Sequence, residues 1–331
     1  MEIRFKAFVA YETGGQFSVE ERLMNVADLP EGDLLVKVAY SSVNYKDVLS
    51  SKGNKGVTRK YPHVPGIDAA GTVEFSSAPA FPTGSQVIIT GYDLGMNTYG
   101  GFSEYIRIPS NWAIMLPEGM QLKHSMYYGT AGFTAALSVR KILDAGIKPS
   151  HGNIAVSGAT GGVGSIAIAI LLKLGYKVTA ISSKYNSEFL LKTLGVENVL
   201  EREHFLSSVL EKSLAPPAFA AAIDTVGGEI LSGLLSSVSY GGIVTCCGMV
   251  ASSELKASVF PFILRGVTLA GIDSVKTGNA LRVEIWNLLK DEWMPNNLST
   301  LASEFPRKEL IDKLRLLENG QAVGRYVMVN A

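Results

Sequence analysis

The sequence contains little cysteine, since Cys246 and Cys247 are its only two in 331 residues. Neighbouring residues of a strand point to opposite faces, so these two thiols are not expected to bond to each other. A fold held by a disulfide framework is excluded, and so is a zinc site built from four cysteines. Histidine is also scarce, and no close pair stands at ligand spacing among its four copies: His63, His124, His151 and His204.

An excess of either charge is absent, because 30 Lys and Arg residues balance 30 Asp and Glu residues. This balance argues against nucleic acid or an anionic membrane as a partner. The longest apolar run, residues 166–172, stops at Lys173 and is too short to cross a bilayer. The first twelve residues, MEIRFKAFVAYE, carry charges within their apolar stretch, unlike a secretory signal. We therefore expect a cytoplasmic protein.

What the chain does have is length and apolar content. With 331 residues, 47% of them hydrophobic, it is about right for two domains with large cores. Its first 120 residues or so contain β-branched strands separated by Gly, Pro and Asp. From about residue 125, helical segments alternate with short apolar strands, which is the rhythm of a doubly wound parallel sheet. Beyond Ser274, a helix over 279–289 and a strand over 324–330 return to the mixed style.

We therefore predict an α/β protein with one domain inserted into another. Residues 1–124 and 274–331 form a mostly-β domain, and residues 125–273 form a nucleotide-binding domain between them. The elements predicted for the inserted domain are strands at 154–158, 177–182, 197–201, 220–226, 241–248 and 267–275, and helices at 164–175 and 187–195.

Residues 154–170, IAVSGATGGVGSIAIAI, predict a buried strand, a glycine-rich turn and a helix. Gly158, Gly161 and Gly164 have the spacing that lets a backbone approach a pyrophosphate, which then meets the free N–H groups at the helix start. Glycines also serve simple tight turns. Here, however, the next strand follows about 20 residues later, where ribose recognition belongs. The segment therefore predicts a dinucleotide site.

The strand at 177–182 is followed by hydroxyls and a base: Ser182, Ser183 and Lys184. An acid at this place would bind both ribose hydroxyls of NAD and repel a 2′-phosphate, whereas hydroxyls and an ammonium group suit a phosphate. Arg202, which follows the next predicted strand, can reach the same place. The alternative is that these residues form only a solvated loop. The absent acid and the present base together favour NADPH as the cofactor.

The chain resembles the medium-chain dehydrogenase/reductase superfamily in GIDAAGTVE at 66–74, YGTAGFTAALSV at 128–139 and the turn at 157–164. NYKD at 44–47 and PFILRGVTLAGIDSV at 261–275 narrow the resemblance to its zinc-independent subfamily of acryloyl-CoA reductases and quinone oxidoreductases. The resemblance implies a GroES-like catalytic domain with a barrel-like β core, an inserted Rossmann domain, and an active site in the cleft between them. It also implies homodimers whose Rossmann sheets pair edge to edge through the strand at 267–275, which needs cover for its apolar face.

The metal ligands of the superfamily's zinc enzymes have no counterpart in this sequence. Those enzymes carry Cys-x-x-Asp where this chain has NYKD at 44–47, and Gly-His-Glu where it has GID at 66–68. The cysteine is replaced by Asn44 and the histidine by Ile67, and neither is a usual zinc ligand. We therefore predict no metal site.

Without a Lewis acid, a conjugated carbonyl is an easier substrate than a plain alcohol. Hydride addition to it needs orientation and a few hydrogen-bond donors aimed at the developing enolate. The candidate donors are the Asn44 amide, the Tyr45 hydroxyl and the Lys46 ammonium; the proton donor could be Tyr45, Lys46 or water. Asn44 and Tyr45 also match family positions near the nicotinamide. Asp68 is a further catalytic candidate, although Asp68 and Asp47 equally fit a structural role in capping a turn or helix.

The resemblance also implies further cofactor contacts. Those at the pyrophosphate fall on Thr160, Gly161, Gly162 and Val163, and those beside the nicotinamide on Met249, Ile263 and Ser274. An asparagine of the family near the closing Gly-Arg is missing, because this stretch has Gly320 and Gln321, so a minor contact is lost. Cys247 could be a redox sensor or, more commonly for such a residue, a packed small hydrophobe.

Three functions remain open on this evidence. They are an NADPH-dependent reductase of acryloyl-CoA, an NADPH-dependent quinone or alkenal reductase, and an NADPH-binding protein with little turnover. The stretch SKGNKGVTRK at 51–60 bears on the first two, because it holds four basic residues and no acid. It either binds the phosphates of coenzyme A or is an ordinary solvated loop.

Overall fold

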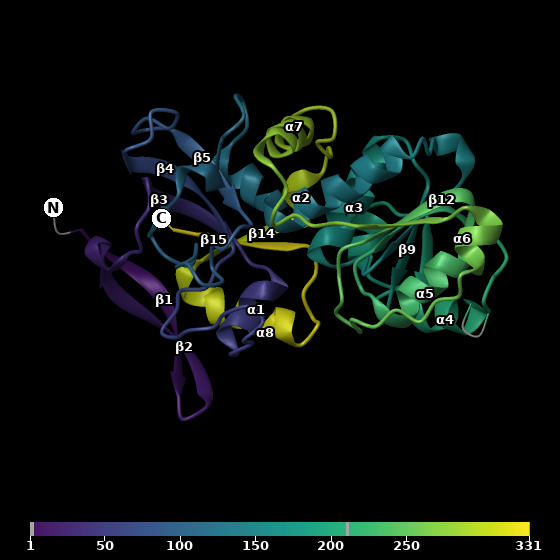
Figure 1. Ribbon diagram of the computed structural model, residues 1–331, viewed down its shortest axis with the longest axis horizontal. Coiled ribbons are helices and arrows are strands. Elements are labelled where there is room, and N and C mark those ends of the chain that lie inside the picture. Colours follow the sequence, from purple (N-terminus) through teal and green to yellow (C-terminus); the bar gives the residue numbers. More distant parts are fainter. Residues whose placement is uncertain (1–2, 210–211, 331) are drawn as a thin grey trace. The chain divides into compact units, whose positions relative to one another are not determined.

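The structure, a computed structural model, describes residues 3–209 and 212–330, which form two compact units (Figure 1). The first unit contains the described chain through Thr130, together with Val275–Lys290 and the chain from Ala302 on. The second unit contains Ala131–Ser274 and Asp291–Leu301. The C-terminal part of the chain thus returns to the unit in which the N-terminal part folds.

The first unit is built on a seven-stranded sheet in the order β14-β15-β3-β4-β5-β7, with β6 paired to β3. Its strands are β3 (Leu34–Ser42), β4 (Asp68–Ser76), β5 (Gln86–Thr90), β6 (Tyr105–Ile108), β7 (Ala113–Met115), β14 (Ala302–Pro306) and β15 (Arg325–Val329). A separate antiparallel pair consists of β1 (Arg4–Thr13) and β2 (Gln16–Asn25). The helices are α1 (Tyr45–Ser51), α7 (Asn279–Lys290), α8 (Leu310–Glu318) and the start of α2 (Leu122–Asp144), with short 3-10 turns η1 (Val26–Asp28), η2 (Ser110–Trp112) and η6 (Arg307–Glu309).

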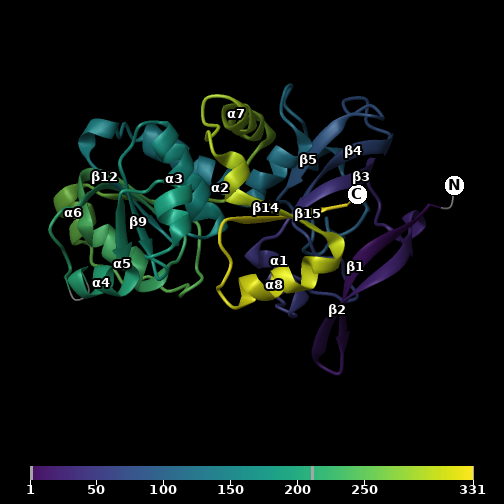
Figure 2. The same cartoon turned by 180° about the vertical axis from the view of Figure 1, so that it is seen from behind.

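The alternation of β3, LLVKVAYSS, explains how this sheet forms one core. Leu34, Val36 and Val38 are buried together, and they pack with Ile89 of β5 and Ile106 of β6. Alternate residues of a strand point to one face, so a single strand supplies three side chains to the same cluster. Figure 2 shows the curved strands of this unit from the other side.

The second unit has a parallel six-stranded sheet in the order β10-β9-β8-β11-β12-β13. Its strands are β8 (Ile154–Ser157), β9 (Val178–Ser182), β10 (Asn198–Glu201), β11 (Phe219–Asp224), β12 (Val238–Cys246) and β13 (Thr268–Gly271). Its helices are α3 (Gly162–Lys173), α4 (Arg202–Val209), α5 (Gly228–Ser237), α6 (Phe260–Arg265), the π-helix η4 (Phe189–Thr193), and 3-10 turns η3 (Pro149–His151) and η5 (Leu298–Leu301). Helices cover both faces, with α3 on one side and α4, α5 and α6 on the other (Figure 1).

The apolar run at 166–172 lies in α3, whose residues from Gly164 to Leu171 are all buried. A helix that is apolar all round is expected where it is covered on every side, and α3 contacts both β8 and β9. Within residues 3–209 and 212–330, no helix combines the length and the apolar character that crossing a bilayer requires.

Two predicted elements differ from those observed. The helix expected at 187–195 is only a five-residue π-helix, in which Leu190 alone is buried, and Gly195 with its φ of +68° follows closely. The strand expected at 267–275 ends at Gly271. The last partner of β13 is Cys246, where β12 itself ends. The Ile272 N–H still donates to the Cys246 carbonyl oxygen at 3.0 Å, and the pairing does not continue beyond it.

Candidate active site

The glycine turn stands at the carboxyl end of β8, as the sequence predicts. Gly158 has a φ of +58°, and a Cβ there would lie 2.2 Å from the Thr225 hydroxyl oxygen. A Cβ on Gly164 would lie 2.4 Å from the carbonyl oxygen of Gly158. These two glycines are therefore required by local packing. Gly161, in contrast, is the N-cap of α3, and it makes no side-chain hydrogen bond to the first turn. The N–H groups of Gly162 and Val163 at this helix start fit an anionic group such as a pyrophosphate.

A buried acid that the sequence analysis missed supports this turn. Asp224, at the end of β11, accepts hydrogen bonds from the Ser157 hydroxyl (2.7 Å) and from the Gly227 N–H (2.8 Å). Burial raises the pKa of the Asp224 carboxyl, while these hydrogen bonds oppose the rise. The Ser157 hydroxyl oxygen in turn accepts from the Thr225 N–H at 2.9 Å. These contacts join the carboxyl ends of β8 and β11. An acid directly after the apolar run FAAAI was the available signal.

The end of β9 brings the predicted phosphate-binding residues together in part. The Ser182 side chain is buried, and its hydroxyl oxygen accepts from the Lys184 N–H at 2.9 Å. Partial burial lowers the pKa of Lys184, whereas Ser183 is exposed. Arg202 begins α4 and pairs with the adjacent Glu203 at 2.6 Å.

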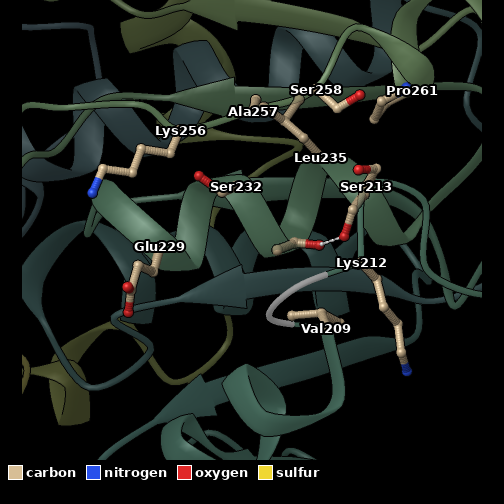
Figure 3. A pocket seen from close by; sticks show the side chains of 12 residues that line it. Val209, Lys212, Ser213, Glu229, Ser232, Leu235, Lys256, Ala257, Ser258 and Pro261 are labelled. Carbon is tan, nitrogen blue, oxygen red and sulfur yellow. Dashed lines mark hydrogen bonds between the residues drawn. The ribbon is translucent and has the colours of Figure 1, made fainter.

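A cavity of about 400 Å³ has Arg202 in its wall, together with Val226 and Ser252. It lies next to the carboxyl end of β11, where ligands of doubly wound sheets bind. A second cavity in this unit, of about 300 Å³, has none of the predicted site residues in its wall (Figure 3). The Lys212 and Lys256 side chains point away from one another there, so they do not converge on one ligand.

The residues expected beside the nicotinamide are not all in one place. Met249 follows β12 near Gly227, and Ser274 follows β13, so both are at the carboxyl edge of the sheet. Ile263 is in α6, where Arg265 donates to the carbonyl oxygens of Ser236 and Val238 at the opposite end of β12. The structure therefore does not bring Ile263 to the glycine turn.

Cys247 is at the carboxyl edge as well, but its thiol is not activated. The thiol donates to the Asp224 carbonyl oxygen at 3.4 Å, and burial raises the pKa of Cys247 to about 12. A thiol that remains protonated is a poor nucleophile. The geometry favours the packed small hydrophobe over the redox sensor.

In the first unit, the start of α1 rests on a buried acid, Asp68 of β4. One carboxylate oxygen of Asp68 accepts from the Ser42 hydroxyl (2.5 Å), the Asn44 amide (2.8 Å) and the Thr130 N–H (2.9 Å). The other accepts from the Thr130 hydroxyl at 2.5 Å. Asp68 is fully buried and saturated with hydrogen bonds, so the contacts it makes are those of a residue that holds others in place.

Asn44 cannot donate to an enolate in this arrangement, which corrects the prediction from the sequence. Its amide nitrogen donates to the Asp68 carboxylate at 2.8 Å and to the Ser42 carbonyl oxygen at 3.2 Å. The Asp68 carboxylate and the Ser42 carbonyl oxygen can only accept hydrogen bonds. If the Asn44 amide were flipped, its oxygen would face these two acceptors, so the orientation with the nitrogen toward them is the favourable one. Both amide hydrogens are therefore used by internal acceptors. This could not be predicted from the sequence, because Asp68 is 24 residues away.

Asp47 of α1 and Arg325 of β15 complete the buried group at the start of α1. Asp47 accepts from the N–H groups of Asn44 (2.7 Å) and Ile67 (2.9 Å), and burial raises the pKa of its carboxyl to about 7. Arg325 of β15 was predicted only as part of a strand. It is 3% exposed, donates to the Val43 carbonyl oxygen at 3.2 Å, and lies 3.8 Å from the Asp68 carboxylate.

Tyr45 and Lys46, in the first turn of α1, are the remaining donors. Tyr45 is 44% exposed, and Lys46 is half-buried. Within the described part of the chain, neither the Tyr45 hydroxyl nor the Lys46 ammonium has a hydrogen-bond or ion-pair partner. These two groups are therefore available to a ligand.

Known proteins resemble the chain along almost its whole length. Two family models match it: "Alcohol dehydrogenase GroES-like domain" at residues 30–118 and "Zinc-binding dehydrogenase" at residues 162–289. YhfP of Bacillus subtilis, which carries a quinone oxidoreductase name, is 41% identical over 99% of each chain. Acrylyl-CoA reductase AcuI of Ruegeria pomeroyi is 38% identical over 97% of each chain. The chain belongs to the medium-chain dehydrogenase/reductase superfamily.

Solved structures of this superfamily match the fold. The yhdH oxidoreductase from Salmonella enterica in complex with NADP gives a TM-score of 0.95 at 38% identity, over 98% of this chain and 100% of that one. The Bacillus subtilis yhfP structure with NAD bound gives 0.95 at 41% identity, over 99% of each chain. The predicted Rossmann sheet and GroES-like domain are therefore confirmed, as is the subfamily, and the chain is an oxidoreductase.

Zinc, which one of the matching superfamily models names, does not fit the residues at the start of α1. The Asn44 amide nitrogen is already bonded to two acceptors, and Ile67 is a buried apolar side chain. Elsewhere in residues 3–209 and 212–330, no three His, Cys, Asp or Glu side chains are grouped so as to hold a metal ion. No step of the reaction is therefore assigned to zinc.

Proposed function

We propose that this protein uses NADPH to reduce a carbon–carbon double bond conjugated to a carbonyl group, without a metal. The observation that carries the proposal is the first turn of α1. Tyr45 and Lys46 are two donors there without a partner in the described part of the chain, and they follow Asn44, which stands where the zinc enzymes of the superfamily have their first ligand. Donors of this kind stabilise an oxyanion, which a conjugated carbonyl develops when a hydride adds to it.

The chemistry divides between the cofactor and the chain. Bound NADPH supplies a hydride to the β-carbon of the acceptor and becomes NADP⁺. The electron pair of the double bond moves toward the carbonyl oxygen, where the Tyr45 hydroxyl and the Lys46 ammonium donate hydrogen bonds. The α-carbon then takes a proton from Tyr45, Lys46 or water, which completes the addition of two hydrogens. Asn44 and Asp68 do not touch the oxyanion in this scheme, since they hold the turn.

NADPH rather than NADH is supported by the end of β9. Ser182 and Lys184 offer a hydroxyl and an ammonium group, and Arg202 adds a guanidinium at the start of α4. The relative from Salmonella enterica was solved with NADP, while the one from Bacillus subtilis was solved with NAD. The pyrophosphate would be held at Thr160, Gly161, Gly162 and Val163 at the start of α3, with Met249 and Ser274 on the nicotinamide side.

Acryloyl-CoA is the acceptor that we propose first, and a quinone or alkenal is the alternative. The named AcuI relative acts on the acrylyl thioester, whereas YhfP carries the quinone name. Of the four basic side chains at 51–60, two already pair with acids. Lys52 pairs with Glu318 at 3.0 Å, and Lys55 pairs with Glu12 at 2.7 Å. Among the described residues no acid pairs with the side chain of Arg59 or Lys60, so these two remain for the phosphates of coenzyme A.

One assay tests these choices together. NADPH oxidation is followed with acryloyl-CoA, crotonyl-CoA, acrolein and a benzoquinone at equal concentrations. We expect the highest kcat/KM with acryloyl-CoA. A higher kcat/KM with the quinone or acrolein would support the alternative function. Tight NADPH binding without turnover of any acceptor would instead support a binding protein and would refute the enzyme proposal.

A homodimer is supported by the exposed edge of the parallel sheet. Among the described strands β13 pairs with β12 alone, so its outer edge has backbone groups that no described strand pairs. Beside it, α6 and the residue before it expose apolar side chains: Val259, Phe260, Ile263 and Leu264. We propose that a second copy of the chain covers this surface. The cytoplasmic location expected from the sequence likewise stays a proposal.

A further inference from the structure

The Asp68 carboxylate has two neighbours that can donate to it, the neutral Asn44 amide and the charged Arg325 guanidinium, and it is hydrogen-bonded to the neutral one. The amide nitrogen of Asn44 is 2.8 Å away, whereas the Nη2 atom of Arg325 is 3.8 Å away. Both charged side chains are buried, at 0% and 3% exposure. The Nε and Nη2 atoms of Arg325 have no hydrogen-bond partner in the described part of the chain. A buried guanidinium beside a carboxylate normally makes two direct hydrogen bonds with it, so something holds Asp68 away.

Thr130 is the residue that does this. The Thr130 hydroxyl donates at 2.5 Å to Oδ1 of Asp68, the oxygen that Asn44 does not use. The Thr130 N–H donates at 2.9 Å to Oδ2, the oxygen that Asn44 does use. Two donors on two oxygens fix the rotation of a carboxylate about its bond to the chain. The Ser42 hydroxyl adds a third donor, on the oxygen that Asn44 also uses.

A break in α2 places Thr130 at this carboxylate. Gly129 has a φ of +52°, which interrupts the helical backbone directly before Thr130. A Cβ on Gly129 would lie 2.2 Å from the Ser42 hydroxyl oxygen and 2.4 Å from the Asp68 carboxylate. Only glycine fits both this backbone angle and this space. The kink therefore brings the chain close enough for both Thr130 donors to reach Asp68.

We propose that Thr130 is a positioning residue for the reaction. It holds Asp68 toward Asn44 and against the pull of Arg325, and Asn44 in turn fixes the first turn of α1 that carries Tyr45 and Lys46. Without the Thr130 hydroxyl, the Asp68 carboxylate rotates toward the Nε and Nη2 atoms of Arg325, which have no hydrogen-bond partner in the described part of the chain, and releases the Asn44 amide. The effect on turnover rests on the proposed function, but the effect on Asp68 does not.

The test uses Thr130→Val, which removes the hydroxyl at nearly constant shape, and Thr130→Ser, which keeps it. Ser125→Ala is the matched control, because Ser125 is a buried hydroxyl in the same helix that donates to the Leu122 carbonyl oxygen at 2.6 Å. We expect Thr130→Val to lower kcat by about 10- to 100-fold with little change in KM, since small displacements of catalytic groups have effects of this size. Thr130→Ser should recover most of the rate, and Ser125→Ala should keep it.

A crystal structure of Thr130→Val supplies a readout that does not depend on turnover. We expect the Asp68 carboxylate to lie within hydrogen-bond distance of Arg325 and the Asn44 amide to have left it. If the contact between Asn44 and Asp68 is unchanged, or if Thr130→Ser is as slow as Thr130→Val, the positioning role is refuted. If the wild type itself shows no turnover, the proposed function fails, and the crystal structure still decides the role of Thr130.

Discussion

Lys184 is the residue on which the choice between NADPH and NADH can be tested most directly. Its backbone N–H donates to the Ser182 hydroxyl oxygen, and partial burial lowers its pKa, as expected for an ammonium group held near the end of β9. A 2′-phosphate would repay this desolvation with a charge-assisted hydrogen bond, for which the usual contribution is roughly 1.5–3 kcal/mol. We therefore expect Lys184→Ala to weaken NADPH binding by about 10- to 150-fold and to leave NADH binding unchanged.

Fluorescence titration with both cofactors measures this difference. Lys192→Ala is the matched control, because Lys192 is in the following π-helix and already pairs with Glu188 at 2.6 Å. The control should bind both cofactors like the wild type. Equal losses for NADPH and NADH in Lys184→Ala, or a wild type that prefers NADH, would contradict the assignment.

At the scale of single elements, the basic stretch after α1 gives a prediction that the sequence could not make. Arg59 and Lys60 are the members of the stretch without an acidic partner in the described chain. If they bind the phosphates of coenzyme A, the double variant Arg59→Ala/Lys60→Ala should raise the KM for acryloyl-CoA by about tenfold or more. The effect should shrink at high salt, because exposed charges are screened. Turnover of a benzoquinone should be unchanged, since it has no phosphate.

Lys52→Ala/Lys55→Ala is the control with the same loss of charge. Those two ammonium groups pair with Glu318 and Glu12, so their removal should leave the KM for acryloyl-CoA alone. It should lower the free energy of unfolding by only about 0.2–1 kcal/mol for each exposed ion pair. If both double variants raise the KM equally, the stretch is an ordinary charged loop.

Some parts of the fold could be predicted from the local sequence, and others could not. The apolar strands and the buried helix α3 have periods that a reader can recognise, so the parallel sheet was predictable. The acceptors of the Asn44 amide were not, because one of them, Asp68, belongs to β4, which is distant in the sequence. Ile263 was misplaced for a similar reason. Its motif marks the family, but only the path of α6 shows at which end of β12 the residue lies.

At the scale of the whole molecule, the apolar surface beside β13 predicts how two copies associate. Val259 and Ile263 are exposed by 62% and 69% and are one helical turn apart, so they face the same side. The double variant Val259→Asp/Ile263→Asp should convert a dimer into a monomer of 35.4 kDa, because two charges per copy would be buried without partners.

Light scattering after size exclusion measures the mass of the particle. Leu23→Asp is the control, since Leu23 of β2 is exposed by 63% in the other unit. This variant should keep the mass of the wild type. A wild type that is a monomer, or a double variant that remains a dimer, would refute the surface that we propose.

The metal independence that we propose can be tested on the whole enzyme. The Asn44 amide and the Ile67 side chain occupy the places of two zinc ligands, and neither can bind the ion in this arrangement. Dialysis against a strong chelator should therefore leave kcat unchanged, and elemental analysis should find no stoichiometric zinc. A rate that falls with chelation and returns with added zinc would contradict this prediction.

The packing of Gly158 and Gly164 has a consequence for how sequences of this kind diverge. A descendant that no longer bound a dinucleotide would be free to change Lys184 or Arg202. It would still keep both glycines, because a Cβ at either would meet the Thr225 hydroxyl or the Gly158 carbonyl oxygen. The glycine signature therefore outlasts the activity and records ancestry. Loss of dinucleotide binding would first be visible after the strand ends, at residues such as Lys184 and Arg202, which lie outside the glycine motif.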